Sequence, residues 1–225
     1  MLIDIVRSNA SCIESLITPP FYWGINVATG GFAGSFTVKP ETMISVLCDI
    51  LECLKKWGFE NIFLLNFHGD LKHNVTILES VRKAYEELGI GSYFVVPEFF
   101  LRRAGISEVK PYMIIQPEKP RNGVEEARQQ EYIDIHAGGF ETSMMVKDFP
   151  GLVDIELART LGSSRTTWEG LKVWQQGEEK AREITPLGYC GNPSDICIDA
   201  AKAFENEIAE TIPGAISDFL KQAHT

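Results

Sequence analysis

The chain has 225 residues, 44% of them apolar, and a formal net charge of −10 at pH 7. This length and apolar content suit one sizeable domain with a full core, residues 1–225. The negative charge opposes binding to a phosphate backbone, so nucleic acid is excluded as an expected partner. No apolar run approaches the roughly 18 residues of a membrane span, and the first residues lack the pattern of a signal peptide.

The cysteines bear on the cellular compartment. There are five, an odd number, and they are scattered without a C-x-x-C pair. This spacing indicates neither a disulfide framework nor a zinc ribbon. We therefore expect a protein of the reducing cytoplasm that does not associate with membranes.

Helix and loop signals alternate in the first third of the chain. Apolar residues recur at helical spacing over residues 2–16, before two prolines. The glycine-rich stretch 24–35 predicts a loop near a ligand. Helical spacing returns over residues 43–57, and Gly58 follows as a predicted C-terminal cap.

The next segments predict a parallel sheet. Residues 62–65 form a short apolar run, which is typical of a buried parallel strand. A helix follows over residues 77–88, with Asn74 as its predicted N-terminal cap and Gly89 at its end. Residues 93–100 predict a second strand. This β-α-β order predicts an α/β fold with helices on both faces of a parallel sheet.

The second half of the chain is less regular. We expect an exposed excursion at 111–128, a short strand or strand end at 133–135, and a helix opening at 142–146. A last helix is expected with Pro193 in its first turn and an end near residue 211. Residues 159–182 form a polar, weakly periodic insertion that the pattern does not assign.

A first polar cluster follows the strand at 62–65, where parallel α/β sheets bind ligands. His68 and Asp70 are two residues apart, so in an extended segment both side chains would converge on one metal ion or a pair of ions. Histidine suits zinc or manganese, and carboxylate oxygens add charge. Gly69 would let the backbone approach the site. The alternative is a capped turn with a surface histidine, and His73 is expected to be exposed and uninvolved.

A second polar cluster, at residues 134–143, follows the next apolar run. It contains Asp134, His136, two glycines and Glu141. A helix N-terminus would explain Glu141 through the helix dipole, but it would not explain Asp134 or His136. The chain has only four histidines, and two of them lie at strand ends beside glycine and carboxylates. This placement favours a metal site.

The two clusters together resemble the creatininase (creatinine amidohydrolase) family. NFHGDLKHN is similar to that family's N-G-H-x-x-N segment, and DIHAGGFETS is similar to its D-x-H-[AG]-G-x-x-E-T-S segment. PPFYWG, FAGS and GYCGNPSDICIDAAK are similar to further family segments. The resemblance therefore spans nearly the whole chain.

The resemblance implies a three-layer αβα sandwich with a mostly parallel sheet, usually assembled as a homohexamer. It implies a hydrolase of a small cyclic amide with two divalent ions, Zn and/or Mn, per complete site. His68 would bind one metal ion, and Asp70 stands where the family has a glutamate ligand of the other. Glu141 would bind metal or its bridging water and share the catalytic role with His136, which would assist proton transfer. Contacts to the small-molecule substrate are expected from five residues: Trp23, Asn66, Gly69, Asp134 and Gly138.

Three departures from the family pattern concern the substrate and the metal. Ala28 and Thr29 stand where the family has a glutamate and a histidine, and Gly139 stands where many members have a glutamate. The family's opening E-x-H-G-x-H-L-P-x-x-T-D segment has no counterpart. We therefore expect a chain truncated at its front, with about half of a dinuclear ligand set, and the codons upstream of Met1 would test this.

Several other functions stay open. Within the same family are hydrolases of keto-inositol rings and deformylases of nucleotide-synthesis intermediates. Four aromatic residues would wall a pocket for a small ring or, alternatively, belong to the core: Tyr22, Trp23, Phe32 and Phe140. A non-catalytic truncated homologue is the alternative of a different class. A dinucleotide-binding module is disfavoured, because no G-x-G-x-x-G follows a first strand.

Overall fold

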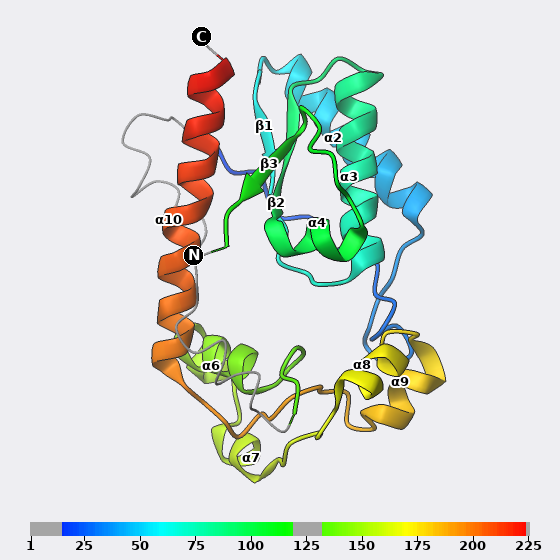
Figure 1. Cartoon of the computed structure of the whole chain (residues 1–225), viewed down its shortest axis with the longest axis vertical. Coiled ribbons are helices and arrows are strands. Elements are labelled where there is room, and N and C mark those ends of the chain that lie inside the picture. The colour runs from blue at the N-terminus through cyan, green and yellow to red at the C-terminus, as the bar shows by residue number, and fades with distance from the viewer. Residues whose placement is uncertain (1–14, 119–131, 224–225) are drawn as a thin grey trace. The chain divides into compact units, whose positions relative to one another are not determined.

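The structure is a computed structural model that describes residues 15–118 and 132–223 (Figure 1). Its contacts divide the chain into two compact units, each assembled from separate segments. The first unit comprises Met1–Asn26, Phe36–Lys119 and Ala209–Thr225, and the second comprises Val27–Ser35 and Pro120–Ile208. The single domain expected from the sequence stays a prediction. The expected helix at 2–16 lies outside the described residues, apart from its last two positions.

A parallel three-stranded sheet forms the centre of the first unit (Figure 1). Its strands are β1 (Ile62–Leu64), β2 (Ser92–Pro97) and β3 (Met113–Gln116), in the order β1-β2-β3. Ile62 is paired with Ser92, and Phe94 with Met113, in parallel register. The predicted α/β fold with a parallel sheet is thereby confirmed.

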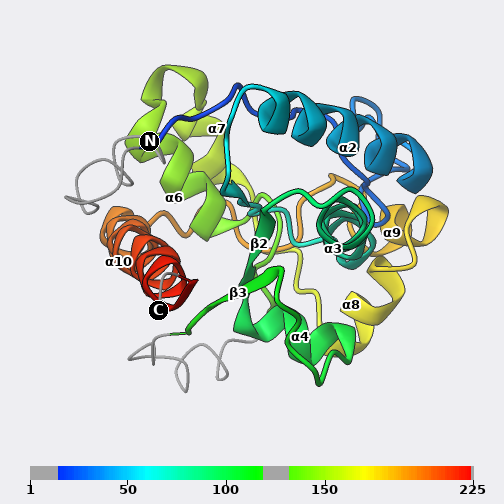
Figure 2. The same cartoon turned by 90° about the horizontal axis from the view of Figure 1, so that it is seen from above.

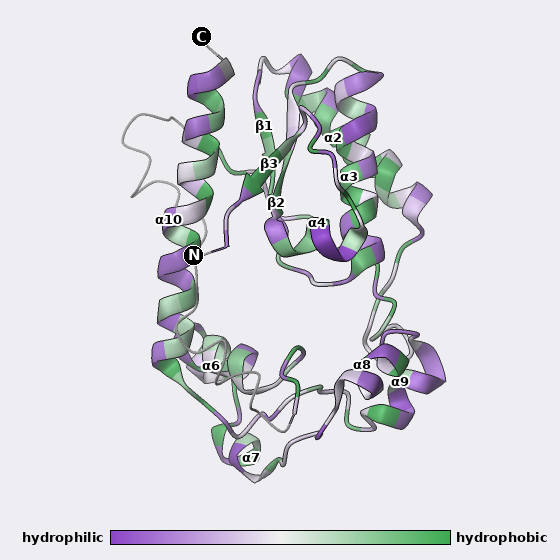
Figure 3. Cartoon of the chain, viewed as in Figure 1, coloured by the Kyte–Doolittle hydropathy of each residue, from purple (hydrophilic) through white to green (hydrophobic). Residues whose placement is uncertain are grey.

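Two amphipathic helices of the first unit pack against each other. They are α2 (Pro40–Lys56) and α3 (Leu71–Glu86). Figure 3 shows apolar and polar residues alternating along both helices, as expected of amphipathic helices at a core. Gly58 and Gly89 follow the two helices with φ of 91° and 61°. Both glycines adopt the left-handed conformation that ends a helix, as the sequence predicted.

Three predictions in the first unit are wrong in detail. Asp70, not Asn74, caps α3, through a bond from His73 N to Asp70 Oδ1. The second strand ends at Pro97, because α4 (Glu98–Ala104) begins at the next residue. The third strand, β3, lies in the stretch expected to be an exposed excursion, and its Met113 is buried. Its apolar run is short and bounded by prolines, which weakened the pattern.

The second unit contains short helices. They are α6 (Gly139–Asp148), η1 (Pro150–Leu152), α7 (Ile155–Thr160), α8 (Trp168–Trp174) and α9 (Glu178–Ile184). The helix expected at 142–146 is confirmed as α6. The strand expected at 133–135 is wrong: within the described residues this region forms only an isolated bridge between His136 and Cys190.

The unassigned segment 159–182 supplies core to the second unit. Its helices α8 and α9 lie side by side (Figures 1 and 2). Leu171, Trp174 and Ala181 are buried together with Cys190, and Phe32 packs against them. The segment is therefore part of the packed interior despite its polar composition.

The last helix, α10 (Ile198–Ala223), differs from its prediction at both ends. It begins five residues after Pro193 and continues through Pro213 to Ala223, whereas the sequence predicted an end near residue 211. Residues up to Ile208 belong to the second unit and the remainder to the first. In the first unit, the centroid of the Phe219 ring lies 4.5 Å from that of the Tyr93 ring of β2. No helix in the described ranges has the length and apolar character to span a membrane.

Candidate functional site

A hydrogen-bonded turn carries His68 and Asp70 from β1 into α3. Asn66 Nδ2 donates to the His68 carbonyl (2.9 Å) and to Asn74 Oδ1 (3.0 Å). Asn74 Nδ2 donates to the carbonyls of His68 (2.7 Å) and Asp70 (2.8 Å), and Asp70 Oδ1 accepts from the His73 amide. These bonds satisfy backbone groups at the start of the helix and fix the shape of the turn.

The His68 ring is exposed, and one of its nitrogens contacts the backbone. Nε2 lies 3.0 Å from the Ile25 carbonyl oxygen. A carbonyl only accepts, so Nε2 carries the proton and Nδ1 of the neutral ring keeps its lone pair. A ring N–H held by a backbone carbonyl is the usual support of a histidine that binds metal through its other nitrogen. His68 therefore fits the role of a metal ligand.

His73 was expected to be exposed, and this part of the prediction is wrong. The residue is 7% exposed, and its Nδ1 accepts from the Ile25 amide at 3.1 Å. Burial, and then the neighbouring His68, lowers the pKa of His73 from 6.5 to about 4. The ring is therefore neutral at pH 7. Its contact partner is 48 positions away in sequence, so no local pattern reveals it.

The other residues expected to contact substrate in the first unit have varied surroundings. Trp23 is half-exposed, with its ring edge-to-face with Phe36 at 5.4 Å. The Gly69 carbonyl accepts from Arg103 Nη1 at 2.7 Å, and a Cβ at Gly69 would meet no atom within 4 Å. The Asn66 amide is engaged within the turn. Substrate contact by these three residues stays a prediction.

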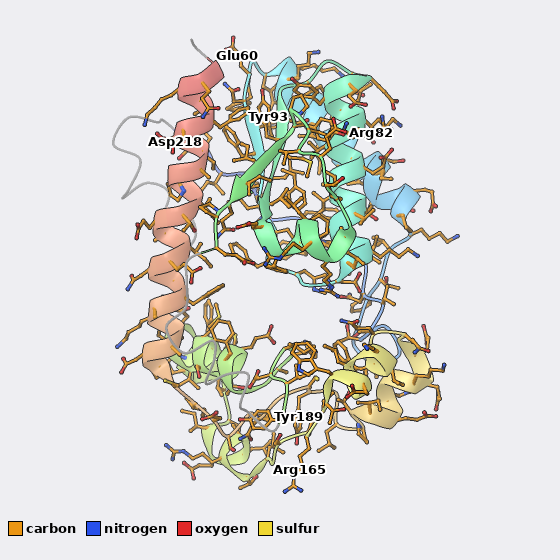
Figure 4. All side chains as sticks on the ribbon, viewed as in Figure 1. Glu60, Arg82, Tyr93, Arg165, Tyr189 and Asp218 are labelled. Carbon is orange, nitrogen blue, oxygen red and sulfur yellow. The ribbon has the colours of Figure 1, made fainter. Side chains whose placement is uncertain are left out.

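The backbone of His136 is fixed in the second unit by Cys190. The Cys190 amide donates to the His136 carbonyl (2.7 Å), and the His136 amide donates to the Cys190 carbonyl (3.1 Å). The neighbouring Tyr189 hydroxyl donates to the Gly162 carbonyl at 2.8 Å (Figure 4). These bonds hold the segment on which His136 is carried.

Glu141 lies in the first turn of α6 and faces His136. Its Oε2 accepts from the Ala137 amide and lies 3.8 Å from His136 Nδ1. The His136 and Glu141 side chains are 40% and 50% exposed. Ala137 has φ 47°, a left-handed conformation that L-residues rarely adopt. The helix-start interpretation of Glu141 is confirmed, and the same position places its carboxylate beside an imidazole.

Trp174 packs near His136 and was missed by the sequence analysis. The two ring centroids are 5.9 Å apart, and Trp174 Nε1 donates to Thr185 Oγ1 at 2.8 Å. Trp174 is buried, as is Leu171 three positions before it on α8. This spacing was the available signal, but the polar residues around it obscured the pattern.

Asp134 is enclosed by the backbone of its own cluster. Its Oδ2 accepts from the amides of Gly139 (2.7 Å) and Asn192 (3.4 Å). Its Oδ1 is buried and has no hydrogen-bond partner within the described ranges. Burial raises the pKa of Asp134, while the two amide donors oppose the shift.

Gly138 is in close contact with this carboxylate. A Cβ at Gly138 would lie 2.2 Å from Asp134 Oδ1, so a larger residue would displace the acid. The structure thus gives Asp134 and Gly138 a role in packing the loop. The substrate contacts expected of both residues stay predictions.

The four aromatic residues considered as pocket walls have different surroundings. Phe140 packs edge-to-face against Phe204 at 5.0 Å, and Phe32 packs against the core of the second unit. The core interpretation is confirmed for Phe32, whereas for Phe140, which is partly buried, both interpretations stay open. Tyr22 and Trp23 are exposed, at 80% and 51%.

The four residues expected at the metal site are divided between the two units. His68 and Asp70 lie in the first unit, and His136 and Glu141 lie in the second. Within residues 15–118 and 132–223, no group of three or more histidine, cysteine or acidic residues is placed to hold a metal ion. The donors nevertheless fit a divalent ion in kind, as an imidazole with a supported second nitrogen and as carboxylates.

Comparison with known families identifies the family of the chain. The family model of creatininase, described as creatinine amidohydrolase, matches residues 4–216. The chain belongs to the creatininase family. The resemblance inferred from the two motifs is thereby confirmed. No curated protein sequence matches this creatininase-family chain.

Solved creatininase structures share the fold of this family member. A crystal structure of creatinine amidohydrolase (creatininase) is 19% identical, with a TM-score of 0.65 over 96% of this chain and 80% of that one. A manganese creatininase is also 19% identical, with a TM-score of 0.64 over 96% of this chain and 80% of that one. A creatininase variant of the zinc–zinc type is 19% identical, with a TM-score of 0.63 over the same shares, 96% and 80%. The expected α/β fold is thus confirmed.

Proposed function

We propose that this creatininase-family chain is a metal-dependent hydrolase of a small cyclic amide. The observation that carries the proposal is the pair formed by His136 and Glu141, an imidazole and a carboxylate 3.8 Å apart and half-exposed at the start of a helix. The family match over residues 4–216 supports the reaction class. The proposal includes a homohexameric assembly, as the motif resemblance implies.

The proposed metal ligands are His68, Asp70 and Glu141. The support for His68 is its exposed ring, with Nε2 on a backbone carbonyl and Nδ1 left with its lone pair. Manganese and zinc–zinc forms of creatininase are the structural precedents for the ion. A divalent ion held by these residues would supply a more acidic water molecule as the nucleophile at neutral pH.

His136 is the proposed proton carrier. Its backbone is fixed by two bonds to Cys190, and its ring lies beside the Trp174 ring, so the imidazole is presented in one place. The Glu141 carboxylate stabilises the imidazolium that forms when the ring takes up a proton from the attacking water. The ring then donates this proton to the leaving nitrogen, because an amide nitrogen leaves poorly as an anion.

Hydrolysis of defined rings tests this proposal. The purified chain is incubated with Zn²⁺ or Mn²⁺ and either creatinine or a panel of five- and six-membered cyclic amides, and ring opening is followed by NMR. We expect turnover that a chelator abolishes. His136→Gln should lower kcat by about 10²-fold or more, because general acid–base catalysis contributes about that factor.

Glu156→Gln is the matched control. Glu156 is an acid of α7 in the same unit, 87% exposed and paired with Arg159 at 3.2 Å. Its replacement should leave the rate unchanged. Turnover that persists with the chelator, or full activity of His136→Gln, would contradict the proposal.

A further inference from the structure

We propose that His73, acting through Ile25, positions His68 so that Nδ1 is the nitrogen offered to the metal ion. This inference rests on the proposed function, because it takes His68 as a metal ligand. It follows from one juxtaposition: the amide of Ile25 donates to His73, and the carbonyl of the same residue accepts from His68. One backbone residue thus connects two imidazoles.

The two backbone bonds fix the protonation of both rings. An amide N–H only donates, so His73 Nδ1, at 3.1 Å from the Ile25 nitrogen, is unprotonated. A carbonyl oxygen only accepts, so His68 Nε2, at 3.0 Å, carries its proton. A metal ion needs a ring nitrogen with a lone pair, and in the neutral His68 ring only Nδ1 has one.

The position of Ile25 depends in turn on His73. Ile25 is 3% exposed, so an unsatisfied amide at this position would be costly. A Cβ at Gly24 would lie 2.9 Å from His73 Cε1, which shows that the ring packs directly on this backbone. The Asp70 cap holds the His73 backbone through its amide. Asp70 therefore contacts His73, His73 contacts Ile25, and Ile25 contacts His68.

The relative orientation of the rings supports a positioning role for His73. The His68 and His73 centroids are 5.0 Å apart, at an interplanar angle of 75°. His73 is 7% exposed, whereas His68 is exposed. The buried ring thus serves as a support and the exposed ring as the group that reaches a ligand. Partners of this kind commonly contribute about 10- to 100-fold to metal affinity.

Two variants of His73 separate positioning from packing. In His73→Asn, the amide oxygen lies as many bonds from Cβ as Nδ1 does in histidine, so the acceptor for the Ile25 amide is kept. In His73→Leu, comparable volume is kept but the acceptor is lost. Zn²⁺ titration of the metal-free protein should show affinity lowered about 10- to 100-fold in the leucine variant and within a few-fold of wild type in the asparagine variant.

Imidazole ¹⁵N NMR measures which nitrogen of His68 carries the proton and which binds zinc, and it does not depend on activity. In the metal-free wild type and in His73→Asn, the His68 Nε2–H should give an observable proton signal, because its bond to Ile25 slows exchange with water. His73→Leu should lose this signal. On addition of Zn²⁺ the His68 Nδ1 resonance should shift, while Nε2 should keep its proton.

A matched pair at His68 gives a second test. The oxygen of His68→Asn lies where Nδ1 does, and the oxygen of His68→Gln lies nearer to the place of Nε2, so the asparagine variant should retain more Zn²⁺ affinity. Zinc bound to Nε2, or a leucine variant with full affinity and an intact Nε2–H signal, would overturn the inference. A wild type that binds no Zn²⁺ would overturn the proposed function and the ligand role of His68, even with the predicted metal-free signals.

Discussion

The two polar clusters are held in place by different kinds of contact. In the first unit, side chains shape the turn: the Asn74 amide bonds to two carbonyls, and the buried His73 ring bonds to a distant amide. In the second unit, backbone pairing and close backbone packing add to the side-chain bonds of Asp134 and Glu141. His136 is bridged to a neighbouring segment through its amide and carbonyl, and Gly138 packs without a side chain against the carboxylate of Asp134.

This difference predicts what each cluster tolerates. A cluster held by side-chain hydrogen bonds is sensitive to protonation and to the loss of a polar group. A cluster held by close backbone packing is sensitive to added volume. The comparison can be tested by changing the pH and by adding volume at each cluster, and by comparing the sign and size of the responses.

The largest expected effect is that of pH on the first cluster. The folded-state pKa of His73, about 4, lies below its unfolded value of 6.5, so its stabilising contribution is full above pH 6.5 and is lost as the pH falls through 4. Each pKa unit corresponds to about 1.4 kcal/mol, so this loss approaches about 3 kcal/mol. Urea unfolding of wild type and His73→Asn at several pH values measures this loss, because the asparagine variant lacks the pH dependence of stability that His73 causes. A stability difference between the two proteins that stays constant from pH 7 to pH 4 would contradict the assignment.

The second cluster should respond to pH with the opposite sign. The pKa of Asp134 is raised by burial above its usual 3.8, so its contribution is full below that pH and is lost as the pH rises through the folded-state value. Comparison of wild type with Asp134→Asn by urea unfolding should show the wild type gaining relative stability as the pH is lowered. A relative loss at low pH would show that the carboxylate is stabilised as the anion.

Added volume should affect the second cluster strongly. Gly138→Ala places a methyl group 2.2 Å from Asp134 Oδ1 and displaces a carboxylate that binds two amides. We expect a loss of about 2–3 kcal/mol in the free energy of unfolding. Gly162→Ala is the control, because a Cβ there meets no atom within 4 Å. Equal stabilities of the two variants would refute the packing role of Gly138.

The double variant with Asp134→Ala sharpens this prediction. Alone, Asp134→Ala removes the acceptor of the Gly139 and Asn192 amides and should cost about 2 kcal/mol. Combined with Gly138→Ala, the total loss should fall short of the sum, because the methyl group no longer meets a carboxylate. Strict additivity would mean that the two residues act independently.

The smallest expected effect concerns glycines of the first unit. Gly24→Ala meets the His73 ring at 2.9 Å and should cost about 1.5 kcal/mol. Gly69→Ala meets nothing within 4 Å, so its stability should change by less than about 0.5 kcal/mol. Thermal unfolding of both variants checks this order, and a reversed order would contradict the described contact between Gly24 and His73.

The sequence was sufficient where the signal is local. Helices α2 and α3 follow from apolar spacing and from the glycines that end them, and β1 from a short apolar run. His68 and Glu141 were chosen as candidates because each lies in a short motif of ionisable residues beside glycine. The motif does not contain the groups that hold these side chains in place, and their role in metal binding stays a prediction.

The remainder depends on contacts between segments far apart in sequence. The role of His73 depends on Ile25, and that of Trp174 on Thr185 and His136, and no local pattern encodes these contacts. The start of α10 was misplaced because Pro193 satisfies the rule for a first helical turn, whereas the helix begins at Ile198. Local propensity gives way there to tertiary packing.

Metal stoichiometry tests the central claim most directly. The purified chain is dialysed against Zn²⁺ or Mn²⁺, and the bound metal is measured by inductively coupled plasma mass spectrometry for wild type, His68→Ala, Glu141→Ala and the Glu156→Gln control. We expect stoichiometric metal in the wild type and in the control, and only a small fraction of it in the other two variants. A wild type without bound metal, or both alanine variants with the full amount, would contradict the account.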